Sequence, residues 1–249
     1  MIPIRDLNPT KTFPIVTAAL IIINLAVFAF VQPRDSAAAG SEFLYRYATI
    51  ACEVVTGNPV SHEEVDTDTC STQPDASVFA DKSIIASVFA SLFLHASWLH
   101  VIFNVWFLWI FGNNVEEAYG SLRYLLGYLA AGVVATLGFV IANPGSVVPL
   151  VGASGAVAGV LGAYLVLFPR HKITSLVFVF FVPVPAFIFL ALWFVGQFGQ
   201  QDAGIAWQAH VAGFLFGVAI TAFMRPSLMR RLARIHSPRR AFGYPSQVR

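Results

Sequence analysis

The sequence has very little charge for its length. Only 11% of the 249 residues are Asp, Glu, Lys or Arg, whereas 57% are hydrophobic and the mean hydropathy is +0.71. A soluble domain usually carries about 25% charged residues to cover its surface, so this composition excludes an ordinary soluble globular protein. Basic residues also form no run interleaved with aromatic residues. We therefore expect no nucleic-acid partner.

The apolar stretches lack the alternation that is typical of membrane strands. A membrane barrel alternates apolar and polar residues, but the apolar runs here are continuous. A helix satisfies its own backbone hydrogen bonds in lipid and needs about 20 mainly apolar residues to cross it. The sequence predicts an all-α polytopic membrane protein with six transmembrane helices, at roughly 13–31, 92–112, 122–142, 151–169, 174–196 and 206–224.

Acidic residues are absent from the C-terminal tail, and this absence predicts the orientation. The tail, 225–249, holds seven arginines, whereas the long first loop, 33–90, holds nine acids against three basic residues. Basic connections stay on the cytoplasmic side. We predict a multi-pass cell-membrane protein with a cytoplasmic N-terminal stub at 1–12, a membrane domain at 13–224 and a basic cytoplasmic tail. Glu116 and Glu117 oppose this pattern, but acids count little in the rule.

Cysteine is scarce, and Cys52 and Cys70 both lie in the first loop. Two cysteines in one loop of an oxidising compartment favour a disulfide, with two free thiols as the alternative.

The first apolar run, 13–31, could be a signal peptide or a retained helix. It is longer than the apolar core of a signal peptide, which has about 7–15 residues. We therefore expect a retained helix, with a leader cleaved near 37–39 as the alternative.

Polar side chains are rare within the predicted helices and are costly there, which makes them default candidates for function. The second helix contains His100 and Asn104, the fourth begins near Ser154, and the sixth contains His210. All three helices are predicted to run from outside to inside. At about 1.5 Å per residue, Ser154 and His210 both lie roughly 5–6 Å below the outer boundary. These side chains can therefore meet near the outer face.

Glycines lie where the fourth and sixth predicted helices would pack. They are Gly155, Gly159 and Gly162 on the fourth helix, and Gly213 and Gly217 on the sixth. Small residues let helix backbones approach closely in lipid, which would bring Ser154 to His210. Histidine is the usual base for a serine nucleophile. His100 and Asn104 share one helix face and can donate hydrogen bonds to an oxyanion.

Each of these residues has a structural interpretation when it is taken alone. Ser154 is then a small packing residue, His210 a buried histidine, and His100 and Asn104 interhelical hydrogen-bonding groups. A metal site is not expected, because the five-residue spacing of His95 and His100 turns them about 140° apart on a helix. No cysteine or carboxylate lies near them in the sequence to complete a zinc site.

Three motifs occur together in chain order: His95-Ala-Ser-Trp-Leu-His100-Val-Ile-Phe-Asn104, Gly152-Ala-Ser154-Gly155 and Ala209-His210-Val-Ala-Gly213. They resemble the motifs of the rhomboid intramembrane serine proteases, and the similarity extends over about 13–224. The resemblance implies a six-helix rhomboid-like bundle without a cofactor. It also implies hydrolysis of peptide bonds in or near transmembrane segments of single-span or polytopic proteins in the lipid bilayer.

Carried over by position, the resemblance implies that Ser154 is the nucleophile and His210 its base. His100, Asn104 and the backbone N–H of Ser154 would hold the oxyanion, and a substrate helix would enter between the second and fifth predicted helices. Many rhomboids place an aromatic residue four positions after the serine, packed on the catalytic histidine. Here that residue is Ala158, so another group must position His210. The alternative function is a non-catalytic rhomboid-like protein that binds membrane helices.

Overall fold

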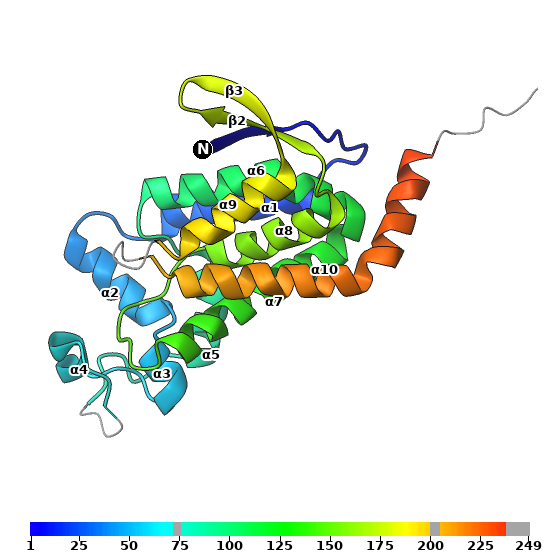
Figure 1. Cartoon of the computed structure of the whole chain (residues 1–249). Helices are drawn as coiled ribbons and strands as arrows, with labels where there is room; N and C mark the ends of the chain where they lie inside the picture. Colours follow the sequence, from blue (N-terminus) through cyan, green and yellow to red (C-terminus); the bar gives the residue numbers. More distant parts are fainter. Residues whose placement is uncertain (72–75, 200–204, 238–249) are drawn as a thin grey trace, which may run out of the picture.

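The computed structural model describes residues 1–71, 76–199 and 205–237, and the chain is mostly helical (Figure 1). The long helices are α1 (Ile15–Ala26) with its π-helical continuation η1 (Val27–Val31), α6 (Trp98–Tyr119), α7 (Ser121–Ala142), α8 (Ser154–Leu167), α9 (Ala186–Gln197) and α10 (Trp207–His236). Helix α8 is buried along most of its length and packs against α6, α7 and α10. Its first residue, Ser154, is partly buried.

Two helices, α7 and α10, are long and apolar enough to cross a membrane. A third span results if α5 (Ile84–Ala90) with its 3-10 continuation η2 (Ser91–Phe93) is joined to α6, which it meets at 77°. Helix α1 with η1, α8 and α9 are apolar but shorter. The predicted mainly helical, apolar architecture is confirmed, whereas the six transmembrane helices stay a prediction.

The predicted helix at 174–196 is wrong in its first half. This part of the chain forms two antiparallel strands, β2 (Lys172–Val177) and β3 (Phe180–Pro185), and α9 begins only at Ala186. Pro183 and Pro185 lack the N–H group that a helix interior needs. The β-branched and aromatic residues around them favour strands. A continuous apolar run does not distinguish these two structures by periodicity.

The N-terminal residues complete a three-stranded sheet beside α6. Strand β1 (Ile2–Asp6) pairs antiparallel with β2, and the strand order is β1-β2-β3 (Figure 1). Trp106 of α6 donates a hydrogen bond from Nε1 to the carbonyl of Pro3 (2.8 Å), and Asn114 donates from Nδ2 to Asp6 (2.6 Å). Burial raises the pKa of Asp6 to about 6. The predicted stub thus includes a strand that is held along α6.

Glu116 and Glu117, the two acids that opposed the orientation rule, are buried at the end of α6. Glu116 accepts hydrogen bonds from the backbone and side chain of Thr17 at the start of α1 (2.8 and 2.9 Å). Glu117 accepts one from the backbone of Thr12 (2.8 Å) and lies 2.8 Å from Nε2 of His236, at the end of α10. Carboxylates are favoured at a helix N-terminus. These acids therefore hold three segments of the chain together.

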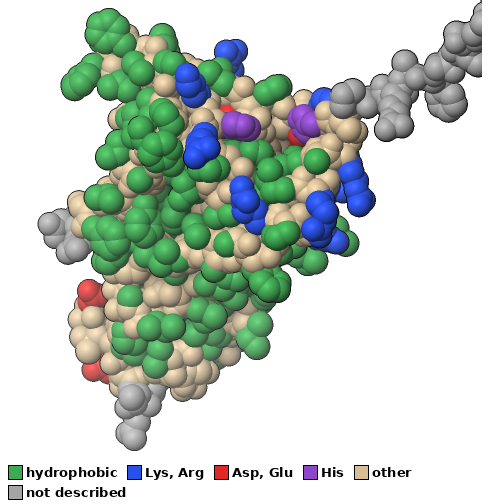
Figure 2. All heavy atoms as spheres, turned by 45° about the vertical axis from the view of Figure 1, so that its right-hand side comes forward, with side chains coloured by type: hydrophobic (Ala, Val, Ile, Leu, Met, Phe, Trp, Pro, Cys, Tyr) green, Lys and Arg blue, Asp and Glu red, His purple; other side chains and the backbone are tan. Residues whose placement is uncertain are grey.

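The basic tail begins inside a helix, because α10 continues through the arginines from Arg225 to Arg234 and ends at His236. It bends near Pro226 (Figure 1). Arg239, Arg240 and Arg249 lie outside the described residues, as does Asp75 of the first loop. Figure 2 shows Lys and Arg side chains gathered toward one end of the molecule, with some acidic and histidine side chains among them, and other acidic side chains at the opposite end. Hydrophobic side chains cover much of the surface between the two ends.

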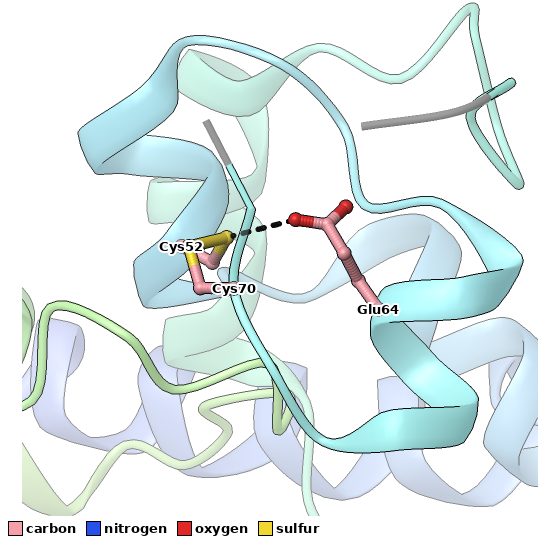
Figure 3. Close-up of side chains that lie close together, drawn as sticks. All are labelled: Cys52, Glu64 and Cys70. Carbon is pink, nitrogen blue, oxygen red and sulfur yellow. Dashed lines mark hydrogen bonds between the residues drawn. A yellow bond between two sulfur atoms is a disulfide. The ribbon is translucent and has the colours of Figure 1, made fainter. Parts of the chain in front are cut away.

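The first loop is folded rather than extended. It contains α2 (Ala37–Tyr47), α3 (Ala51–Thr56), α4 (His62–Thr67) and α5. Cys52 and Cys70 are joined by a disulfide, and Oε1 of Glu64 lies 3.4 Å from Sγ of Cys52 (Figure 3). Because thiolates, not disulfide sulfurs, are metal ligands, these three groups do not provide a metal site.

A buried ion pair joins α3 to the segment just before α5 within the first loop. Nζ of Lys82 lies 2.6 Å from Oε2 of Glu53, and both side chains are 1% exposed. Nζ of Lys82 also donates to the carbonyl of Tyr45 (2.7 Å), and the backbone of Val60 donates to Glu53 (3.1 Å). Burial raises the pKa of Glu53 and lowers the pKa of Lys82, since loss of hydration outweighs their attraction.

Replacement Lys82→Met is expected to destabilise the folded loop by about 3–5 kcal/mol, because it leaves a carboxylate buried without its partner. The midpoint of thermal unfolding in detergent should fall accordingly. The double replacement Glu53→Leu/Lys82→Met removes both charges and should recover most of the loss. Equal losses in the single and double variants would contradict the importance of the unpaired charge.

Candidate active site

Ser154 is the first residue of α8 and follows a turn that requires glycine. Gly152 has φ +128°, and its N–H donates to the carbonyl of Ser91 (3.0 Å). A Cβ atom at Gly152 would come within 2.8 Å of the imidazole ring of His100. Glycine therefore lets this ring approach the turn. The N–H of Ser154 has no partner within its helix, as is usual in a first turn, and the helix dipole favours negative charge there.

His210 lies in the first turn of α10, with its Nε2 atom 2.8 Å from Oγ of Ser154. The close packing of α8 on α10 produces this contact. A Cβ atom at Gly213 would overlap the carbonyl of Gly155, and one at Gly217 would overlap the carbonyl of Gly159. Gly162 likewise lies against the backbone of α10. All five glycines singled out in the sequence thus lie at this helix–helix contact.

His100 and Asn104 lie one turn apart on α6. Asn104 donates from Nδ2 to the carbonyl of His100 (3.1 Å) and is 5% exposed. The ring of His100 lies 5.1 Å from that of His95, centroid to centroid. His95 is buried, and its backbone exchanges two hydrogen bonds with Gln32 (both 2.9 Å). His95 therefore fixes the chain just before α6.

One large cavity connects these groups. Its volume is about 1470 Å³, and Ser154, His210, His100 and Asn104 all line it. Residues of α6, α7, α8, α9 and α10 form its walls, together with α2 of the first loop and the segment 148–152 before α8. A cavity of this size exceeds the usual 300–1,000 Å³, approximately, of small-molecule sites. It has room for water and for an extended peptide segment beside the serine.

Sequence reasoning missed Gln197, the last residue of α9. Its Oε1 atom lies 2.7 Å from Nδ1 of His210, on the opposite side of the ring from Ser154. Its Nε2 atom donates to the carbonyl of Trp193 (3.0 Å). The available signal was a polar side chain at the end of an apolar run, but Gln197 falls one residue beyond the predicted helix at 174–196.

The site can support nucleophilic chemistry. A serine hydroxyl within hydrogen-bond distance of an imidazole is the usual arrangement of an activated nucleophile. Donors near the serine can stabilise an oxyanion. A family model, the rhomboid domain, matches residues 83–227, more than half of the chain. The chain belongs to the rhomboid family. The family predicted from the three motifs is therefore confirmed.

This rhomboid resembles proteins from several organisms. It is 33% identical over 139 residues to Rhomboid protein 1, mitochondrial, of Saccharomyces cerevisiae, covering 53% of this chain and 40% of that protein. It is 46% identical over 72 residues to Rhomboid protease GluP of Bacillus subtilis, covering 29% and 14%. It is 31% identical over 166 residues to RHOMBOID-like protein 1 of Arabidopsis thaliana, covering 64% and 41%. The matches thus span less than half the length of these relatives.

Proposed function

We propose that this rhomboid is an intramembrane serine protease that cleaves peptide bonds in or near the transmembrane segments of membrane proteins. The distance of 2.8 Å between Oγ of Ser154 and Nε2 of His210 carries the proposal. The large cavity in which this pair lies supports it, as does the similarity to a relative named a protease.

In the proposed reaction, Nε2 of His210 takes the proton of Ser154 while Oγ attacks the carbonyl carbon of the peptide bond. The carbonyl oxygen becomes an oxyanion, which accepts hydrogen bonds from the N–H of Ser154 and from His100 and Asn104. His210 then gives the proton to the leaving amine. Water attacks the acyl-enzyme by the same route and releases the second product. No cofactor is needed.

The short length of α8 supports the proposal that the serine works below the membrane surface. Its 14 residues extend about 21 Å, less than the hydrocarbon core of about 30 Å. If α8 reaches the inner face, Ser154 lies several ångströms below the outer one, at the wall of the cavity. We propose that α1 with η1, α6, α7, α8, α9 and α10 are the six membrane helices. The cavity would supply water from outside.

The proposed orientation places the first loop outside and the end of α10 inside. A membrane-impermeant thiol reagent should therefore label Cys52 or Cys70 in intact cells after reduction, and only weakly before it, because the structure joins these residues. An epitope added after Arg249 should resist a protease applied from outside. Digestion of that epitope in intact cells would invert the helices and place Ser154 near the cytoplasmic face.

Incubation of the purified protein in liposomes with a panel of single-span membrane proteins tests the proposed activity. Cleavage within or beside the membrane segment is expected, and Ser154→Ala should remove it. The alternative, a non-catalytic binder of membrane helices, predicts that wild type and Ser154→Ala retain the same partners and that neither cleaves them.

A further inference from the structure

Gln197 is the polar residue that α9 presents to the candidate base. Its side chain is 3% exposed and lies against Nδ1 of His210, while Ser154 contacts Nε2 of the same ring. The serine, the imidazole and the amide therefore form a chain of two hydrogen bonds, 2.8 and 2.7 Å long. These three hydrogen-bonded side chains belong to α8, α10 and α9, respectively.

The orientation of the Gln197 amide determines which ring nitrogen carries hydrogen. Its NH₂ group donates to the carbonyl of Trp193, so its oxygen is the atom that faces His210. An amide oxygen can only accept a hydrogen bond. Nδ1 of His210 must therefore carry hydrogen, which leaves the lone pair of Nε2 directed at Ser154. This is the tautomer in which His210 can remove the serine proton.

No other described group holds the ring in this way. Position 158, four residues after the serine, is alanine and offers no ring to stack on the imidazole. Trp193 lies 6.3 Å from the ring of His210, centroid to centroid, at 34°. Within residues 1–71, 76–199 and 205–237, no carboxylate hydrogen-bonds to His210. Gln197 thus supplies the second polar contact of this ring.

Aromatic side chains at the end of α9 and just after it pack against α10. The rings of Phe194 and Phe214 lie 4.9 Å apart, and those of Phe198 and Trp207 lie 5.2 Å apart. Other apolar side chains of α9, such as Leu192 and Val195, are more than half exposed. Helix α9 also forms a wall of the cavity. A movement of α9 away from α10 would widen the cavity and also separate Gln197 from His210.

We propose that Gln197 is a positioning residue that fixes the tautomer and orientation of His210, and that it does so only while α9 is packed on α10. This inference rests on the proposed protease function. When an entering substrate segment displaces α9, His210 loses its contact with Gln197 and is no longer oriented. The contact forms again once α9 packs back on α10. The cutting step is thereby coupled to the position of one cavity wall.

Two replacements of Gln197 separate hydrogen bonding from packing. Gln197→Met keeps the length of the side chain but loses the acceptor, and Gln197→Glu keeps an acceptor. The readouts are the rate at which a small fluorophosphonate labels Ser154 in detergent, and kcat and KM for a single-span substrate. Gln197→Met should lower labelling and kcat by about 10–100-fold with little change in KM. Gln197→Glu should retain a higher labelling rate and a higher kcat than Gln197→Met. The control is Ser227→Ala on α10, which does not line the cavity and whose hydroxyl donates to the carbonyl of Met224 (2.8 Å); both readouts should stay unchanged in it.

A double-mutant cycle tests the coupling to α9. Phe194→Ala should loosen α9 and lower the labelling rate of the otherwise wild-type protein, but it should change the rate little when Gln197 is already Met. If the effects of Phe194→Ala and Gln197→Met on the labelling rate are additive, the coupling is refuted. If Gln197→Met leaves the labelling rate unchanged, the positioning role is refuted. Absence of both labelling and cleavage in the wild type would instead refute the proposed protease function.

Discussion

Replacement of Ser154 by alanine is expected to abolish cleavage, and His210→Ala should lower its rate to a similar extent, by about 10⁴–10⁶-fold. In the proposed mechanism, nucleophile and base act in the same step, because Nε2 of His210 removes the proton of the Oγ atom that lies 2.8 Å away. The double replacement should therefore add little to either single change. Initial rates with one single-span substrate in liposomes measure these effects.

The matched control for this pair is Ser237→Ala. Ser237 lies just past the end of α10, and its hydroxyl donates to the carbonyl of Arg234 (2.8 Å). Its replacement should leave the rate unchanged. Full activity in Ser154→Ala, or losses that multiply in the double variant, would contradict a single serine–histidine unit.

Replacement Asn104→Ala is expected to lower kcat by about 10²–10³-fold, the usual effect of removing one donor to an oxyanion. Asn104 uses one of its two amide hydrogens to bond the carbonyl of His100, which leaves the other available to the substrate oxygen. Because the oxyanion exists only in the transition state and the tetrahedral intermediate, KM should change little. Steady-state kinetics of the purified variant separate kcat from KM.

Asn24→Ala provides the structural control for Asn104. Asn24 of α1 is fully buried and donates from Nδ2 to the carbonyl of Leu20 (2.7 Å), the same bond to the residue four positions before it. If Asn104 acts only by bracing its helix, the two replacements should have similar effects on stability and on rate. A loss of kcat confined to Asn104→Ala supports a role in the reaction.

The location of the candidate site could be predicted because polar groups are costly in a membrane. That cost leaves few polar side chains in the apolar segments, and Ser154, His210, His100 and Asn104 were among them. The glycines Gly155 and Gly213 further indicated which helices pack closely. The depth of Ser154 and His210 in the membrane stays a prediction, which rests on the direction of each helix and its rise per residue.

Other features depend on contacts that no sequence pattern reveals. The hairpin formed by β2 and β3 has the continuous apolar composition of a membrane helix, and only Pro183 and Pro185 indicated a break. In the sequence, Glu116 and Glu117 opposed the charge pattern that predicts the orientation. In the structure, Glu116 bonds to the start of α1 and Glu117 contacts the end of α10. The contact of Gln197 with His210 depends on how α9 packs on α10.

Mass spectrometry of the protein after treatment with a fluorophosphonate tests most directly whether His210 activates Ser154. These reagents form a covalent bond to a serine that a neighbouring base has activated. One adduct is expected, on the peptide that contains Ser154, and it should be absent from Ser154→Ala and from His210→Ala. An adduct on a different serine, or continued cleavage of a substrate by a protein in which Ser154 is fully modified, would contradict Ser154 as the nucleophile.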